Sequence, residues 1–236
     1  MRFARMPYLF VAPDGDHVEI EGQDARHLVR SLRVRPGEQV EAVDPGDGTR
    51  GRMLTVRIET VRPERVTGVV VDAREHRPEP RAPIHLALAL LPGPALGEAL
   101  ARCTELGAAG FLLVEAERSV ARARGDSKAQ RWATICREAA MLAGRLRVPK
   151  VQGPVPLSTL VELAPGELVL LDGRAGERLA VLPPAERTLA IGPEGGWTPA
   201  ERARVRNHAR LGPRNLRAEN AAAAALTVAL SAAGDL

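Results

Sequence analysis

The sequence lacks the features that define several common protein classes. Of its 236 residues only two are cysteines, Cys103 and Cys136, and both lie in helix-like apolar patterns. A disulfide framework and a cysteine-rich zinc site are therefore excluded. No apolar run approaches the roughly 18 residues that a membrane-spanning helix needs. The N-terminus has no apolar stretch followed by a small-residue cleavage site, which argues against a secretory signal. We expect a cytoplasmic protein.

Familiar motifs of nucleotide binding and catalysis are also missing. The sequence has no G-x-x-x-x-G-K-[ST], and no G-x-G-x-x-G follows the first strand predicted for its C-terminal part, so the P-loop and the standard dinucleotide fingerprint are excluded. The G-x-S-x-G of the α/β-hydrolases is absent as well. The histidines show no metal-ligand spacing, and we expect structural or surface roles for them and no metal. They are His17, His27, His76, His85 and His208.

Lysine is nearly absent, because only Lys128 and Lys150 among the 33 basic residues are lysines. The others are arginines, which suit bidentate phosphate contacts and stacking on bases. The formal net charge is +4, and the basic excess is concentrated between Glu115 and Lys150. This segment is either a solvated helical face or a nucleic-acid surface, and its composition alone leaves both open.

The length allows one large domain or two small ones, and the pattern of the chain favours two. Residues 1–73 predict a small β-barrel, because short alternating or β-branched segments are separated by turn residues. One helix, beginning at Asp24, interrupts them. Residues 74–83 contain three prolines and are interpreted as a linker. The strands are predicted over 18–21, 39–43, 53–61 and 66–71.

Residues 84–236 predict an α/β domain with a parallel sheet. Residues 84–91 form a near-continuous apolar run, which is typical of a strand buried on both faces. Strands that alternate with helices indicate a parallel sheet. Further strands are predicted over 111–114, 167–171 and 188–191, and helices over 96–106 and 132–143.

The first candidate site is the segment 191–201. It contains a glycine-rich loop at 192–196, with the sequence Gly-Pro-Glu-Gly-Gly. A predicted strand ends just before it. A helix begins just after it, marked by the capping box of Thr198 and Glu201 with Pro199 between them. Glycines at the carboxyl end of a strand let the backbone approach a ligand closely, and open α/β sheets bind ligands at that edge. A tight turn without a ligand would explain the same glycines.

The second candidate site is the polar segment 211–221, which precedes a small-residue helix predicted over 221–230. Glu219 and Asn220 suit a helix N-terminus by charge and by capping, and they need no further function to explain them. Arg217 is different, because a cation is unfavourable at a helix N-terminus unless it has an anionic partner. Arg217 is therefore the residue of this segment that points to function.

Shorter segments accompany these two loops along the chain. They are Thr104-Glu105-Leu106-Gly107, Glu117-Arg118-Ser119-Val120, Gly144-Arg145 with Val148-Pro149, and His27-Leu28 with Leu32-Arg33 and Pro36-Gly37. Together with Ile191-Gly192-Pro193-Glu194-Gly195-Gly196 and Leu216-Arg217-Ala218-Glu219-Asn220-Ala221, they resemble the RsmE family. The members of this family are 16S ribosomal RNA (uracil-N3) methyltransferases of the SPOUT class. The resemblance covers nearly the whole chain in order.

This resemblance implies a fold, a cofactor and partners. Residues 1–73 would form a PUA-like β-barrel that binds RNA. Residues 84–236 would form a SPOUT α/β methyltransferase domain with a C-terminal trefoil knot. The expected cofactor is S-adenosylmethionine, and the expected partners are 16S ribosomal RNA, within the 30S subunit, and a second copy of the chain. No membrane is expected to take part.

The resemblance also implies site residues. The expected cofactor-binding residues are Leu171, Asp172, Ile191, Gly192, Pro193, Glu194, Gly195, Gly196, Leu211, Gly212, Leu216, Ala218, Asn220 and Ala221. The expected RNA-binding residues are Arg5, Arg30, Arg33, Arg118, Arg122 and Arg145.

The expected catalytic residues are Arg217 and Glu219. N3 of uracil must lose its proton before or while it attacks a methyl group, and a cation such as Arg217 would lower the cost of the resulting anion. Glu219 is either the general base or the group that orients Arg217. We favour orientation, because a carboxylate at a helix N-terminus is held in its charged, weakly basic form. N3 lies on the Watson–Crick edge, so the target base must be unpaired or flipped out.

Some residues depart from the family pattern and remove polar groups near the expected site. They are Gly93, Met141-Leu142-Ala143 and Asn220.

Two alternatives to uracil-N3 methylation stay open. One is another SPOUT RNA methyltransferase activity, such as ribose 2′-O-methylation. The other is a non-catalytic RNA-binding factor of ribosome assembly.

Overall fold

A computed structural model of the protein describes residues 8–119, 126–183 and 185–236. The chain divides into two compact units. Unit 1 consists of Met1–Glu79 and Ala140–Arg147, and unit 2 of Pro80–Ala139 and Val148–Leu236. The segment 74–83, interpreted as a linker, begins inside strand β5 (Arg65–His76), and the division between the units follows Glu79.

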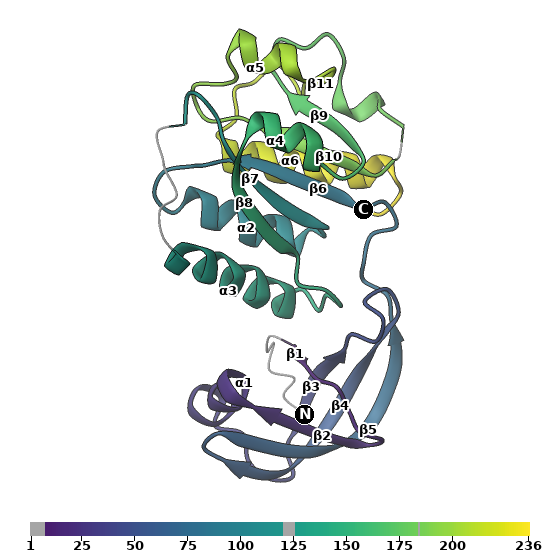
Figure 1. Cartoon of the computed structure of the whole chain (residues 1–236). Helices are drawn as coiled ribbons and strands as arrows, with labels where there is room; N and C mark the ends of the chain where they lie inside the picture. Colours follow the sequence, from purple (N-terminus) through teal and green to yellow (C-terminus); the bar gives the residue numbers. More distant parts are fainter. Residues whose placement is uncertain (1–7, 120–125, 184) are drawn as a thin grey trace. The chain divides into compact units, whose positions relative to one another are not determined.

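Unit 1 is built on a curled sheet of five strands in the order β1-β3-β4-β5-β2 (Figure 1). Strands β1 and β3 are parallel and the other pairs are antiparallel. The alternation seen in the sequence is the burial pattern of β2, in which Val18 and Ile20 face the core. The strand bounds are β1 Leu9–Phe10, β2 His17–Glu21, β3 Gln39–Asp44, β4 Gly51–Arg62 and β5 Arg65–His76.

The helix predicted from Asp24 has two parts. An α-helical turn, α1 (Gly22–Arg26), continues into a π-helix, His27–Leu32. The helix ends at Arg33, which adopts the left-handed conformation with φ 52°. Leu28 is fully buried and anchors this segment to the core of unit 1.

A buried ion pair fastens the segment 140–147 into unit 1. The side chains of Glu79 and Arg145 are only 2% and 3% exposed, and Arg145 Nη2 lies 2.5 Å from Glu79 Oε2. Glu79 Oε1 also accepts hydrogen bonds from the backbone N–H of Leu146 and of Arg147. His76 Nε2 lies 2.6 Å from the carbonyl oxygen of Gly144. Residues distant in sequence therefore complete this unit through polar contacts.

Unit 2 contains a six-stranded sheet in the order β11-β9-β10-β6-β7-β8, and every ladder in it is parallel. The sequence predicts four of these strands. Strands β8 and β11, helix α4 and, in unit 1, strand β1 were not predicted. The strand bounds are β6 Ile84–Ala89, β7 Gly110–Glu115, β8 Lys150–Pro156, β9 Glu167–Leu171, β10 Arg187–Ile191 and β11 Asn207–Ala209. The helix bounds are α2 Ala95–Glu105, α3 Asp126–Leu142, α4 Leu157–Leu163, η2 Leu179–Val181, α5 Pro199–Arg204 and α6 Ala218–Ala232.

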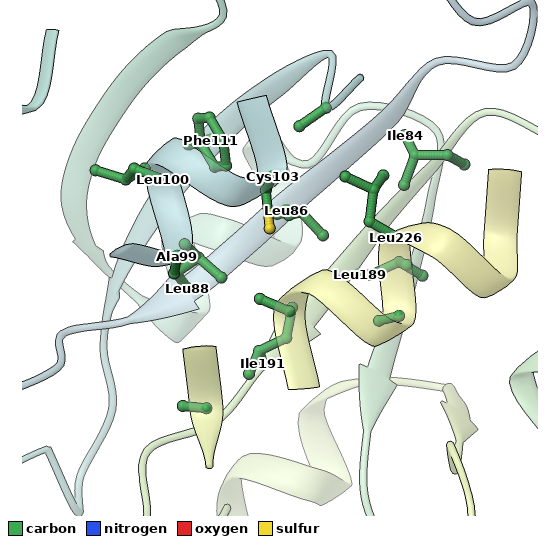
Figure 2. Close-up of a cluster of buried hydrophobic side chains, with 14 of the residues drawn as sticks. Ile84, Leu86, Leu88, Ala99, Leu100, Cys103, Phe111, Leu189, Ile191 and Leu226 are labelled. Atoms are coloured by element: carbon green, nitrogen blue, oxygen red, sulfur yellow. The ribbon is translucent and has the colours of Figure 1, made fainter. Parts of the chain in front are cut away.

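Apolar side chains cover both faces of this sheet. On one face, Leu86 and Leu88 of β6 pack with residues of α2 and α6, such as Leu100 and Leu226 (Figure 2). On the other face, Ala87 belongs to a cluster with residues of α4 and with Trp197 and Val205, which flank α5 (Pro199–Arg204). The near-continuous apolar run at 84–91 is explained by this double coverage.

The segment after β11 is held against the loop that follows β9. Asp172 N donates to Ala209 O at 3.0 Å, Arg210 N donates to Glu177 O at 2.9 Å, and Leu179 N donates to Arg210 O at 3.0 Å. Two loops distant in sequence therefore adjoin at the carboxyl edge of β9. The knotted threading that the resemblance implies for this part stays a prediction. Among residues 8–119, 126–183 and 185–236, no helix is both long enough and apolar enough to cross a bilayer.

We expect Glu79→Ala to destabilise unit 1 by about 3–5 kcal/mol, because Arg145 would lose its buried carboxylate partner. Urea denaturation followed by amide hydrogen exchange in β3–β5 would measure the change in unit 1 alone. Glu19→Ala is the matched control, since its ion pair with Arg65 is exposed on both sides and should contribute about 0–1 kcal/mol. Equal losses in the two variants would contradict the structural role of the Glu79–Arg145 pair.

Candidate functional site

A cavity of about 380 Å³ opens at the carboxyl ends of β9 and β10, beside the start of α6. This is the edge at which open parallel sheets bind ligands. All of the predicted cofactor residues except Asn220 line it. The two loops singled out in the sequence therefore meet in one cavity, together with the loop after β9.

Close packing of Trp197 on Gly192 shapes one wall of the cavity. A Cβ atom at Gly192 would lie 2.9 Å from Cε2 and Nε1 of the Trp197 indole, so any larger side chain would displace the ring. The indole N–H of Trp197 donates to Leu171 O at 3.2 Å. This glycine is therefore required by a close approach, and the hydrogen bond ties the loop after β10 to the end of β9.

The capping box predicted for α5 is present and has a wider role. Thr198 Oγ1 accepts from Glu201 N, and Glu201 Oε2 accepts from Thr198 N at 2.8 Å. Glu201 is only 4% exposed, and its other oxygen accepts from Glu117 N at 2.8 Å. The carboxylate thus joins the loop after β10 to the loop after β7.

Arg118 was predicted to contact RNA, and the structure places it against the cavity loop. Its Nη1 donates to Gly195 O at 2.8 Å. A Cβ atom at Gly195 would lie 3.2 Å from the Arg118 Cβ, so the aliphatic part of this side chain packs on the loop. The guanidinium therefore forms a hydrogen bond with a backbone carbonyl of the cavity wall.

Asp172, directly after β9, forms an ion pair with Arg202. Its Oδ2 lies 3.2 Å from Arg202 Nη1, and its Oδ1 accepts from Arg174 N at 3.0 Å. The side chain is 14% exposed. Asp172 therefore orders the turn after β9 while it lines the cavity.

The start of α6 places the predicted catalytic residues beside the cavity. Arg217 is the N-cap residue, and its side chain makes no capping hydrogen bond. Leu216 and Ala218 line the cavity, whereas Arg217 and Glu219 are not among the lining residues. Arg217 is exposed and Glu219 is half-buried in the first helical turn. Within the described part of the chain, no hydrogen bond or ion pair joins these two side chains.

Asn220 was predicted to bind the cofactor, and the structure does not place it among the residues that line the cavity. Its Oδ1 accepts a hydrogen bond from Arg102 Nη1 of α2 at 3.2 Å, which joins the two helices. A contact of Asn220 with the cofactor stays a prediction.

Five residues that line the cavity were not among the predicted cofactor-binding residues, although three of them belong to the two candidate segments. Arg214 and Asn215 lie in the segment 211–221, whose polar character could have identified them. Trp197 directly follows the glycine loop. Arg210 gave no signal, since only its backbone pairing with Glu177 and Leu179 places it at the cavity. The missed lining residues are Gly173, Trp197, Arg210, Arg214 and Asn215.

The predicted RNA-binding arginines have different surroundings. Arg30 and Arg33 are exposed on unit 1, as expected of phosphate contacts. The prediction for Arg145 is wrong, because its guanidinium is buried against Glu79 and is not accessible to a phosphate. Arg5 and Arg122 lie outside the described residues.

The chemistry of the cavity is that of an organic ligand held largely by backbone. In the described ranges, no group of three or more His, Cys, Asp and Glu side chains could hold a metal ion. Burial raises the pKa of the Cys103 thiol to about 12, and this side chain does not line the cavity. Glycine loops leave backbone N–H and C=O groups accessible to a ligand, and a volume of this size suits one small molecule.

Comparison with known families first defines the class of the protein. A family model described as an RNA methyltransferase domain matches residues 77–230, and one described as an RNA methyltransferase PUA domain matches residues 20–52. The class is therefore that of the RNA methyltransferases with a PUA domain. These matches confirm the predicted fold class of a PUA-like N-terminal unit and an α/β methyltransferase unit.

Individual relatives define the family. The ribosomal RNA small subunit methyltransferase E of Mycobacterium tuberculosis is 34% identical, over 94% of this chain and 90% of that one. The Bacillus subtilis protein of the same name is 28% identical, over 88% and 87%. The Neisseria gonorrhoeae enzyme of this name, crystallised with S-adenosyl methionine, superposes with a TM-score of 0.84 at 26% identity, over 96% and 97%. The chain belongs to the family of ribosomal RNA small subunit methyltransferase E, the RsmE family.

We expect Gly192→Ala to displace the Trp197 indole and to break its hydrogen bond to Leu171, since the added methyl group would overlap the ring. Tryptophan emission should shift to the red as the buried ring gains solvent. Gly212→Ala is the matched control, because Gly212 lines the same cavity and a Cβ atom there has open space. Unchanged emission in a folded Gly192→Ala protein would contradict this account of the cavity wall.

Proposed function

We propose that the protein transfers the methyl group of S-adenosylmethionine to N3 of a uridine in 16S ribosomal RNA. The observation that carries the proposal is the cavity itself. The loops after β9 and β10 and the start of α6 meet there, in a chain that belongs to a family of ribosomal RNA methyltransferases. A relative of the same fold was crystallised with this cofactor.

The residues of the cavity fit S-adenosylmethionine. Gly192, Gly195 and Gly212 would leave backbone groups open to the polar atoms of the donor, and Leu171, Ile191 and Leu211 would offer apolar contact. When bound, this cofactor supplies an electrophilic methyl group on a sulfonium. A cationic donor gains nothing from additional cations, so its binding should depend on shape and backbone rather than on Arg217.

Arg217 is proposed to stabilise the uracil anion that forms as N3 loses its proton. It is exposed next to the cavity-lining Leu216 and Ala218, so its guanidinium can turn towards a base that enters from solvent. The residue caps no backbone group of α6, which leaves its charge available for substrate. Glu219 is proposed to orient Arg217 or to accept the proton.

The proposal extends to partners. We infer a homodimer in which a second copy helps to complete the site, because Leu216 lines the cavity and is 43% exposed. The expected substrate is the small-subunit RNA, within the 30S subunit. Action on ribosomal RNA supports the cytoplasmic location expected from the sequence.

Incubation with labelled donor and small-subunit RNA, followed by nucleoside analysis, tests the function. We expect label in 3-methyluridine and in no other nucleoside. Label in a 2′-O-methylated nucleoside would replace the proposal by another RNA methyltransferase activity. If the protein binds both naked RNA and 30S subunits but transfers no methyl group to either, it is a non-catalytic assembly factor. Calorimetric titration of the Gly192→Ala variant with S-adenosylmethionine tests whether the donor binds in the cavity. The displaced Trp197 should then lower the affinity for the donor.

We expect Arg217→Ala to lower single-turnover methylation by about 10²–10³-fold, the loss typical of one anion-stabilising donor. The affinity for S-adenosylmethionine, measured by calorimetry, should change little. Arg217→Lys should recover part of the rate, because it restores the charge without the planar fork. A higher pH should partly rescue Arg217→Ala, since more uracil N3 is then already deprotonated.

A double-mutant cycle distinguishes the two roles proposed for Glu219, orienting Arg217 and accepting the proton. If Glu219 acts through Arg217, Glu219→Gln should have no further effect in the Arg217→Ala background. If it accepts the proton, the two losses should multiply. A normal single-turnover rate in Arg217→Ala at neutral pH would refute the assignment of Arg217.

A further inference from the structure

A second, smaller pocket of about 170 Å³ lies between the loop after β6 and helix α3, and we call it the Trp132 pocket. Trp132 and Ile135 of α3 and Leu91 and Leu96 provide its apolar surface. Trp132 is only partly buried, whereas Leu91 and Leu96 belong to the core cluster of unit 2. The pocket therefore combines a partly exposed aromatic side chain with apolar residues that belong to the core.

The charged side chains that the structure describes around the pocket are basic. Lys128 and Arg131 line it, and no acidic side chain is among its described lining residues. Both cations are exposed one helical turn apart on α3. The combination of an aromatic ring with basic groups is the one with which proteins bind single-stranded nucleic acid, through base stacking and phosphate contacts.

The position of the pocket relates it to the methylation site. Strands β6 and β10 are neighbours in the sheet, and Leu88 pairs with Ile191. On β10 the lining of the cavity begins with Ile191, and the lining of the Trp132 pocket begins with Leu91, three residues after Leu88. Both sites therefore lie at the same carboxyl edge of adjacent parallel strands, yet they share no lining residue. A ligand in the Trp132 pocket would be a different group from the one in the cavity.

We propose that the Trp132 pocket binds an unpaired nucleobase of the RNA substrate that flanks the methylated uridine. The base stacks on Trp132, and Lys128 and Arg131 contact the adjoining phosphates. This inference rests on the proposed function for the identity of the RNA. Recognition of the target then depends on a neighbouring splayed base as well as on the base that enters the cavity.

Titration of the purified full-length protein with decauridylate, followed by tryptophan fluorescence, tests the pocket. Stacking of a base on Trp132 should quench part of the emission, and Trp132→Leu should remove that part. The affinity for decauridylate should fall roughly tenfold or more in Trp132→Leu, as expected for loss of one stacked base. Trp132→Phe retains an aromatic ring and should lose less affinity, which separates stacking from a change in packing.

The charged groups are tested in the same titration. Arg131→Gln should weaken binding and reduce the salt dependence of the affinity by about one unit of slope. Arg204→Gln is the matched control, because it removes the same charge from an exposed position on α5 that lines neither site. Inorganic polyphosphate should bind without Trp132-dependent quenching, since it has no base to stack.

The outcomes separate the pocket from the catalytic proposal. If ribosomal RNA is methylated but Trp132→Leu retains the decauridylate affinity and the RNA KM of the parent protein, the pocket proposal is wrong. The same conclusion follows if Arg204→Gln weakens binding as much as Arg131→Gln. If no methyl transfer occurs and the Trp132-dependent binding persists, the catalytic proposal fails and the nucleobase pocket remains. Donor affinity should be unchanged in every Trp132 pocket variant.

Discussion

The buried carboxylate of Glu201 holds together the sheet edge on which the candidate site depends. One of its oxygens closes the first turn of α5 on Thr198, and the other accepts from the backbone of Glu117. A carboxylate that is 4% exposed must satisfy its hydrogen-bonding capacity within the protein, and backbone donors do so here. This requirement fixes the loop after β10 relative to the loop after β7. The Arg118–Gly195 hydrogen bond lies between the same two loops.

The cavity is consequently a product of backbone geometry. Gly192 approaches an indole, Asp172 orders a turn, and Arg118 secures a carbonyl. The side chains proposed to carry chemistry, Arg217 and Glu219, lie beside the cavity, and Arg217 is exposed. This separation fits a methyl transfer in which the methyl donor binds by shape in the cavity. The acceptor base enters from solvent, and its N3 atom must lose a proton.

Local signals predicted most of the fold, and they identified two segments that line much of the cavity. Capping residues identified the start of α5, and alternation identified β2 to β5, because these features act over a few residues. Strand β8 was missed because its residues are mostly exposed and include prolines, and β11 has only three residues. The surroundings of Arg145 and Asn220 could not be predicted, and the reason is the same for both. Their partners, Glu79 and Arg102, are distant in sequence, and no spacing rule reveals such a pair.

The composition of unit 1 bears on how the chain folds during synthesis. The unit includes residues 140–147, which emerge from the ribosome only after a large part of unit 2. Until then Glu79 has no Arg145 to pair with, and the segment that contributes Met141 to the core is missing. The N-terminal unit therefore cannot complete its folding first, although domains commonly fold in the order of their synthesis. The last steps of its folding overlap with those of the methyltransferase unit, so a nascent chain that stalls before residue 147 would expose an unfinished RNA-binding unit.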